Sequence, residues 1–96
     1  MNNIERPVLI TTEFRGVFFG YAKDTSGDTV TLYRARNCIY WPANQGGFAG
    51  LASDGPVKGS RIGSSVSQME LRKVTSVTEV TTEAAAVWKA ANVYRG

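Results

Sequence analysis

The amino-acid sequence predicts a mainly β domain of the α+β class. We expect a small SH3-like or Sm-like β-barrel of about five antiparallel strands, with a long glycine-rich loop and a C-terminal helix. β-branched residues favour strands, and valine, isoleucine and threonine supply 23 of the 96 residues. Short apolar segments bounded by turn residues follow one another over 7–41 and again over 64–80. With 43% hydrophobic residues, the chain 1–96 has the length and composition of one domain.

The first part of the chain predicts three strands. Apolar and polar residues alternate over 7–13, and an apolar segment over 17–22 follows. The polar residues 23–28 predict a turn, which joins the second strand to a third over 29–41 as an antiparallel hairpin. Gly20 lies inside the second strand, where glycine predicts a bulge or a close approach of backbone.

The third strand changes its alternation part-way along. Val30 and Leu32 share one face, whereas the apolar residues from Tyr33 onward occupy the odd positions. An alternation that reverses within one strand requires a bulge or a sharp bend. We expect this reversal to let Arg34 and Arg36 leave the core and project together from one face.

The segment 42–63 predicts a long loop, because it holds six of the ten glycines. Residues 48–52 are expected to form one short helical turn inside it. Two further strands are predicted over 64–80, where valine, threonine and serine predominate. The alanine-rich segment 82–93 predicts a helix, with Thr81 or Thr82 as its N-cap and Trp88 docking it onto the sheet.

Composition excludes several kinds of active site. The chain has no histidine and one cysteine, Cys38, so it lacks Ser-His-Asp and Cys-His catalysis, intramolecular disulfides and multi-cysteine metal sites. Cys38 indicates a reduced thiol that packs as a small hydrophobic residue. We therefore expect no enzyme activity, metal or cofactor, and a location in the cytoplasm of a host cell. The sequence holds no apolar run long enough to span a membrane.

Several short motifs resemble an uncharacterised family of short phage and prophage proteins. They extend over most of the chain, at 8–12, 19–20, 35–41, 50–52 and 82–89. This chain has Arg34, Arg36 and Asn37 where that family more often has two adjacent arginines. The resemblance implies a viral accessory protein, and it brings no established activity.

Arginines beside aromatic residues form the candidate site. Guanidinium groups bind phosphate, and aromatic rings can stack on a base. A net charge of +3 is compatible with an anionic partner. The alternative is that the aromatic residues belong to the core or to a subunit interface and the arginines are solvated or pair with Glu70 or Glu79. The candidate ligand-binding residues are Arg34, Arg36, Asn37, Tyr40, Trp41, Lys58 and Arg61.

These residues predict a non-enzymatic phage accessory protein that binds a nucleotide or single-stranded nucleic acid and counters a host defence. A host defence protein is also considered as a partner. The alternative function is a protein-interaction or virion component, whose mark is a large apolar surface patch. Adjacent Phe18 and Phe19 point to opposite faces of a flat strand, so one of them needs a cover, which the terminal helix or another subunit can provide. We therefore expect a homo-oligomer.

Overall fold

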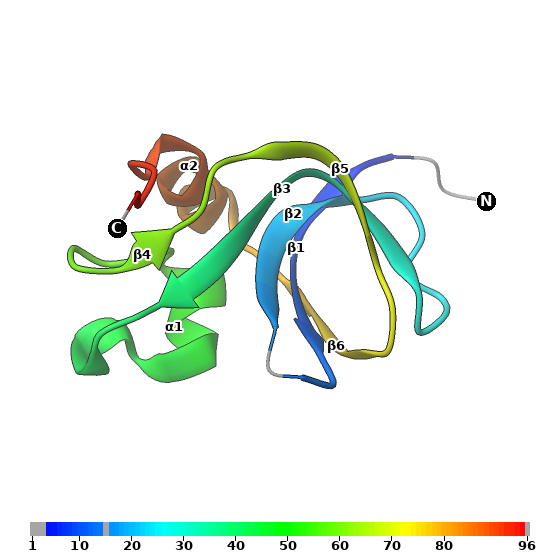
Figure 1. Cartoon of the computed structure of the whole chain (residues 1–96), viewed down its shortest axis with the longest axis horizontal. Helices are drawn as coiled ribbons and strands as arrows, with labels where there is room; N and C mark the ends of the chain where they lie inside the picture. The colour runs from blue at the N-terminus through cyan, green and yellow to red at the C-terminus, as the bar shows by residue number, and fades with distance from the viewer. Residues whose placement is uncertain (1–3, 15, 96) are drawn as a thin grey trace.

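The structure is a computed structural model that describes residues 4–14 and 16–95. Two helices lie together at one end of a curled sheet (Figure 1). Within the described ranges the elements are β1 (Arg6–Thr12), β2 (Val17–Ala22), β3 (Val30–Tyr40), a 3-10 turn η1 (Ala43–Gln45), α1 (Gly47–Ser53), β4 (Arg61–Ile62), β5 (Val66–Leu71), β6 (Val74–Glu79) and α2 (Thr82–Ala90).

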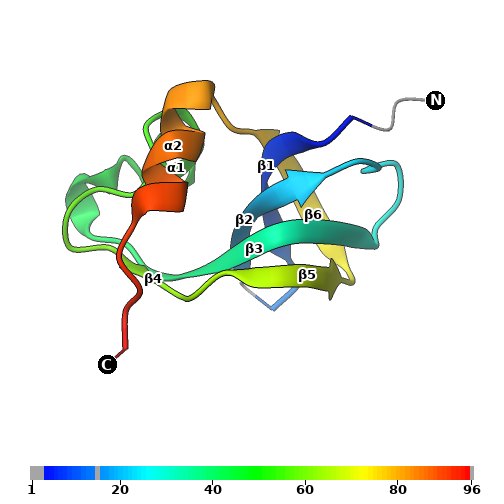
Figure 2. The same cartoon turned by 90° about the horizontal axis from the view of Figure 1, so that it is seen from above.

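The strands form one antiparallel sheet in the order β4–β3–β2–β1–β6, and β5 also pairs with β3. β3 is 11 residues long, so its first part pairs with β5 and its last part with β4. The mainly β class and the β2–β3 hairpin are thereby confirmed. The sheet curls (Figure 2), but it is not closed, because no pairing joins β5 to β6 in the described chain. The predicted SH3-like or Sm-like barrel is therefore not confirmed.

Two hydrophobic cores lie on the two faces of the central strands. The first core packs the sheet against both helices, and the second core contains strand residues alone. In β1, Leu9 enters the first core while Val8 and Ile10 enter the second, as the alternation of a strand requires. The first core comprises Leu9, Val17, Phe19, Cys38, Leu51, Ala52, Ile62, Val80, Ala84, Ala85 and Trp88. The second comprises Val8, Ile10, Ala22, Val30, Leu32, Ala35 and Leu71.

A bulge in β3 accounts for the reversed alternation. Tyr21 pairs with Tyr33 but Phe19 pairs with Arg36, so β3 has one residue more than β2 between these pairs. Arg34 takes a left-handed backbone conformation there, with φ of 52°. The bulge also lies opposite Gly20, where an added Cβ would come within 3.0 Å of Leu32. The predicted bulge is confirmed, but the residues that it turns inward differ from the prediction, as described for Arg36 below.

The segment 42–63 is more ordered than a loop. It contains the expected helical turn as α1, and it also contains β4, which the sequence did not predict. A buried side chain, Gln45, holds the following residues: Nε2 donates to Gly55 O at 2.7 Å, and Oε1 accepts from Val57 N at 2.8 Å. Gly50 is required beside it, because a Cβ at this position would lie 1.9 Å from the carbonyl oxygen of Gln45.

α2 begins and docks as the sequence predicts. The N-cap is Thr81, whose Oγ1 accepts a hydrogen bond from Ala84 N at 3.0 Å. Trp88 is fully buried, stacks on Phe19 with 5.1 Å between ring centres, and donates from Nε1 to Leu51 O at 3.0 Å. The helix ends at Ala90 rather than near residue 93. Phe18 packs against the second core, so this core provides at least part of its cover.

Candidate functional site

Arg36 is buried, so the expectation that Arg34 and Arg36 project together is wrong. Arg36 is 5% exposed and donates hydrogen bonds of 2.8 Å to three carbonyl oxygens, those of Gly63, Trp88 and Ala91. Two of these carbonyls lie at the C-terminal end of α2, where arginine is a favourable capping residue. Burial lowers the pKa of Arg36 from its ordinary value. The role that this geometry gives Arg36 is to tie α2 to β3.

Arg34 is exposed at the bulge and is already engaged. Its Nη2 lies 2.7 Å from Glu5 Oε1, and its guanidinium carbon lies 4.4 Å from the centre of the Tyr21 ring. Lys89 of α2 approaches the same ring, with Nζ at 5.8 Å from the centre. The structure therefore places Arg34 with Glu5 and Tyr21, and not in one cluster with Arg36.

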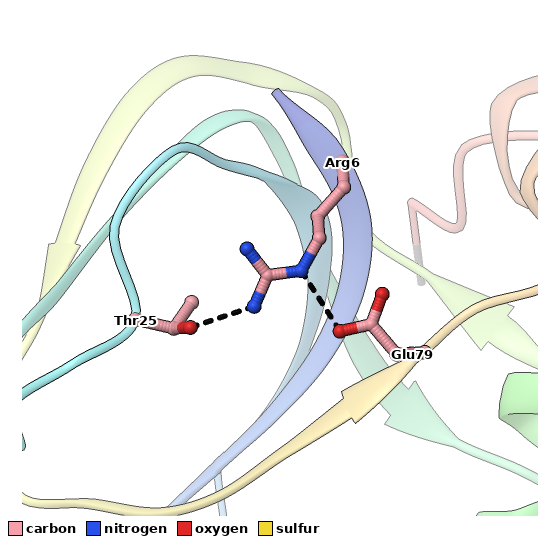
Figure 3. Close-up of polar contacts among 3 residues, drawn as sticks. All are labelled: Arg6, Thr25 and Glu79. Carbon is pink, nitrogen blue, oxygen red and sulfur yellow. Dashed lines mark hydrogen bonds and ion pairs between the residues drawn. The ribbon is translucent and has the colours of Figure 1, made fainter. Parts of the chain in front are cut away.

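Two further arginines hold carboxylates. Arg6 donates from Nε to Glu79 at 2.8 Å and from Nη2 to Thr25 at 2.7 Å (Figure 3). These contacts join β1 to β6 and to the β2–β3 turn. Arg72 forms an exposed ion pair with Glu70 at 2.9 Å. Arg6 therefore has two of its guanidinium nitrogens engaged, whereas Arg72 contacts its glutamate through Nε alone.

Arg61 is held between two tyrosine rings. Its guanidinium carbon lies 5.0 Å from the centre of the Tyr40 ring and 5.0 Å from the centre of the Tyr94 ring. Both tyrosines are exposed, at 46% and 40%. No carboxylate forms an ion pair with Arg61 in the described part of the chain. We call Arg61, Tyr40 and Tyr94 the Arg61 clamp.

Three neighbouring backbone segments build the clamp. Arg61 in β4 pairs with Tyr40 of β3, and Ile62 forms an isolated bridge with Val93 on the other side of β4. Tyr94 N donates to Ile62 O at 2.9 Å, which fixes the segment that carries the second ring. Ile62 is buried in the first core, so the preceding residue, Arg61, points to the opposite face, as strand alternation requires.

The remaining candidate residues are distributed around this region. Asn37 is exposed, and its carbonyl oxygen accepts from Gly63 N at 2.9 Å. Trp41 is partly buried against the first core, as in the core alternative drawn from the sequence. Lys58 lines a cleft of about 450 Å³ between the residues 56–60 and α2. The structure thus brings Tyr40 and Arg61 together and gives each of the other five a different setting.

The net charge lies in the helical half of the molecule. Residues 1–35 and 64–80 carry six cations and six anions, so this half is neutral. Residues 36–63 and 81–96 carry five cations and two anions, which accounts for the whole net charge of +3. The Arg61 clamp and Lys58 both belong to the positive half.

The described residues place the Cys38 thiol in the first core and gather no set of metal ligands. Burial raises the pKa of the Cys38 thiol to about 11, so the thiol is protonated at neutral pH. No group of three or more histidine, cysteine, aspartate or glutamate side chains is placed to hold a metal ion within 4–14 and 16–95. In the same ranges, no helix has the length and apolar character needed to cross a bilayer.

Sequence reasoning missed two residues that shape this region. The predicted helix over 82–93 ends just before Tyr94 and gives this residue no partner, so the sequence does not indicate its role. Gln45 was not selected because nothing in a glycine-rich segment indicates which polar side chain is buried. The sequence feature that could indicate Tyr94 is its position beside Arg95, and an aromatic residue next to one arginine is a weak signal.

Most of the chain matches a known protein family. Residues 5–88 match the family described as domain of unknown function DUF6948. The chain belongs to this family. The DUF6948 match includes Tyr40, Lys58 and Arg61, whereas Tyr94 lies beyond it. Membership of an uncharacterised family is thereby confirmed, and the phage origin stays a prediction. Comparison with curated proteins and with solved structures finds no match.

Proposed function

We propose that this protein binds an anionic ligand without catalysis, namely single-stranded nucleic acid or a nucleotide, and that the Arg61 clamp holds a phosphate group. The observation that carries the proposal is the Arg61 guanidinium held between two exposed tyrosine rings with no carboxylate partner in the described chain. Arg6, Arg34 and Arg72, by contrast, are already paired with glutamates.

The clamp suits a phosphate for a physical reason. A guanidinium presents its N–H donors along the edge of a plane, in a fork that matches two phosphate oxygens. The rings restrict this plane, so less conformational freedom is lost when the phosphate binds. Exposed tyrosine rings also offer surfaces on which a neighbouring base can stack.

The charge distribution supports the same ligand class. The helical half carries the whole net charge of +3, and the clamp lies within it. A localised positive field attracts a polyanion and raises its rate of association, and this contribution falls steeply with salt. Binding through the clamp is therefore expected to weaken strongly as ionic strength rises.

The test is the binding of fluorescently labelled single-stranded RNA and DNA oligonucleotides, measured by anisotropy across a salt series. We expect the Arg61→Ala protein to bind about tenfold more weakly, with a salt slope smaller by about one. Arg61→Lys keeps the positive charge but lacks the planar N–H donors of the guanidinium. We therefore expect its salt slope to be close to that of the wild type and its affinity to stay lower.

Arg72→Ala is the matched control, because it removes the same charge from an arginine whose side chain is 79% exposed in the neutral half. Equal binding by the Arg61→Ala and Arg72→Ala proteins would contradict the role of the clamp. If the wild-type protein binds neither oligonucleotide at low salt, the proposed function itself is wrong.

One observation favours a second candidate function, the binding of a protein. Ile39 is 51% exposed and Val93 is 37% exposed, and both are next to clamp residues in the sequence. Tyrosine and arginine with apolar neighbours are typical of energetically important interface residues. Purification from a host strain, followed by identification of what is retained, distinguishes the two: a protein lost in Ile39→Glu supports this candidate, and co-purified nucleic acid supports the first.

The proposed biological role is interference with a host defence that uses nucleotide signals or nucleic-acid targets. It follows from the resemblance to phage proteins together with the proposed ligand class. Phage plating on a defence-bearing host tests this role: expression of the wild-type protein is expected to restore plaques, and expression of the Arg61→Ala protein is not.

A further inference from the structure

The cleft between residues 56–60 and α2 has the volume of a small-molecule site. Its volume is about 450 Å³, within the range of roughly 300–1,000 Å³ that such sites occupy. Buried Ile62 contributes to its lining, and Val87 of α2 adds an apolar side chain that is 39% exposed. The residues that line it are Pro56, Val57, Lys58, Gly59, Ser60, Ile62, Val87, Ala90, Ala91 and Asn92.

A buried polar side chain fixes the loop wall of the cleft. Gln45 is 3% exposed, and its amide group contacts Gly55 O, Val57 N and Ser60 Oγ at 2.7, 2.8 and 3.3 Å. Burying a polar group is costly unless its hydrogen bonds are satisfied, and here the loop satisfies them. The wall is therefore formed before any ligand arrives.

A second buried polar side chain fixes the helical wall. Arg36 donates to the carbonyl oxygens of Trp88 and Ala91, which lie within the stretch 87–92 that forms this wall. The two walls also touch, because a Cβ added at Gly55 would lie 2.7 Å from Val87 Cβ. Both walls are thus held by buried side chains, Gln45 and Arg36, that do not themselves line the cleft.

The polar lining residues suit one class of ligand. Lys58 is the one ionisable side chain among the lining residues, so the cleft favours a single anionic group. Asn92 supplies an amide, which can pair with the polar edge of a nucleobase. The Ser60 hydroxyl donates to Gln45 Oε1, so it offers the ligand its oxygen as an acceptor. The apolar walls suit the faces of the base and the sugar.

We propose that this cleft binds one nucleotide, with its base against Val87 and Ile62 and its phosphate at Lys58. The proposal rests on the proposed function, because it assigns a nucleotide to a second site apart from the Arg61 clamp. Lys58 and Arg61 thereby act in different sites, although they are three residues apart in the sequence. A free mononucleotide and one nucleotide of a longer strand share this chemistry.

The test uses isotope-labelled full-length protein and four probes: adenosine 5′-monophosphate, adenosine, inorganic phosphate and a single-stranded oligonucleotide. Amide chemical shifts are followed during each titration. Adenosine monophosphate is expected to give saturable shifts over residues 56–62 and 87–92, and adenosine and phosphate alone are expected to bind at least about tenfold more weakly. A terminal nucleotide of a longer strand is the ligand if the oligonucleotide gives the same shifts at lower concentration.

Two substitutions with matched controls locate the site. Ala90→Phe fills the cleft, and Ala86→Phe places the same side chain at an exposed position of α2 that does not line it. Lys58→Ala removes the cleft charge, and Lys73→Ala removes an equal charge from the neutral half. We expect Ala90→Phe and Lys58→Ala to weaken binding of the monophosphate at least about tenfold and about fivefold, and the controls to change it less than about twofold. Circular dichroism checks the fold of each variant, and Lys58→Ala keeps the test valid if Ala90→Phe fails to fold.

The outcomes separate this inference from the proposed function. The inference fails if the monophosphate gives no saturable shifts at about 5 mM, or if its shifts are confined to Tyr40, Arg61 and Tyr94. Oligonucleotide binding that still depends on Arg61 would then leave the proposed function standing. A different outcome is that the monophosphate shifts the cleft residues while Arg61→Ala leaves the oligonucleotide affinity unchanged. That outcome would support the cleft as a nucleotide site and contradict the phosphate-binding role of the Arg61 clamp.

Discussion

At the scale of single residues, Arg36 places a cation in the interior without a carboxylate partner. Its described contacts are all carbonyl oxygens, and Nη2 has no hydrogen-bond partner among the described residues. The negative end of the α2 dipole offsets part of the cost of burying this charge. The arrangement makes the attachment of α2 depend on one side chain.

Replacing Arg36 is therefore expected to affect stability rather than binding. Arg36→Ala leaves three carbonyl oxygens without their donors and opens a cavity, so we expect the free energy of unfolding to fall by about 3 kcal/mol. Urea unfolding followed by tryptophan fluorescence measures the loss, and Arg72→Ala, expected within about 0.5 kcal/mol of wild type, is the control. A loss below about 1 kcal/mol would contradict the helix-tying role.

Cys38 is predicted to be unreactive in the folded protein. Burial raises the pKa of its thiol to about 11, against an ordinary value of 9.0, so near pH 8 the thiolate fraction falls about 100-fold. Because the folded protein holds this thiol protonated, the group costs no stability below pH 9.0. As pH rises toward about 11, ionisation of the thiol in the unfolded chain lowers the free energy of unfolding. Reaction with a chromogenic disulfide reagent is expected to be slow in buffer and fast in denaturant. Equal rates would show that the thiol is accessible.

The residue pattern predicted the β3 bulge but not which arginine it buries. Alternation shows where the two faces exchange, and Arg34 does lie at that point. Arginine is rarely buried, so no sequence signal favoured Arg36 over Arg34 as the inward residue. That assignment depends on α2, whose free carbonyls supply the partners.

At the scale of elements, Gln45 determines the shape of the segment between β3 and β4. Its side chain ties η1 to residues 55–60, which belong to no helix or strand. Gln45→Ala is expected to lower the free energy of unfolding by about 2 kcal/mol and to speed amide exchange at Val57 more than in β1. Hydrogen exchange by mass spectrometry or NMR checks this. Unchanged protection of residues 55–60 would contradict the role of Gln45.

Long elements were predictable and short ones were not. The alanine-rich composition and a threonine cap predicted α2. Apolar segments bounded by turns predicted the strands over 7–41, and the valine, threonine and serine content predicted those over 64–80. β4 comprises two residues, Arg61–Ile62, which is too short for a periodic signal. The Arg61 clamp depends on β4 and on the isolated bridge between Ile62 and Val93, and neither feature has a sequence pattern that predicts it.

At the scale of the whole molecule, the oligomeric state stays a prediction. The outer edge of β5 is not paired with another strand in the described chain, and Val66 on this strand is 41% exposed. Exposed edges promote pairing between chains. We expect light scattering at micromolar concentration to give at least twice the mass of one chain, and Val66→Lys to give the mass of a single chain. A monomeric wild type would contradict the homo-oligomer.

The two cores share the same three central strands, and this has a consequence for how the protein loses its structure. Neighbouring residues of β1 serve opposite cores, as Leu9 and Ile10 do, and β3 passes from the second core to the first at its bulge. Loss of one core therefore disorders strands that the other core also needs. We expect no stable intermediate in which only one of the two cores is folded. Heating is expected to produce one cooperative transition, with equal calorimetric and van't Hoff enthalpies.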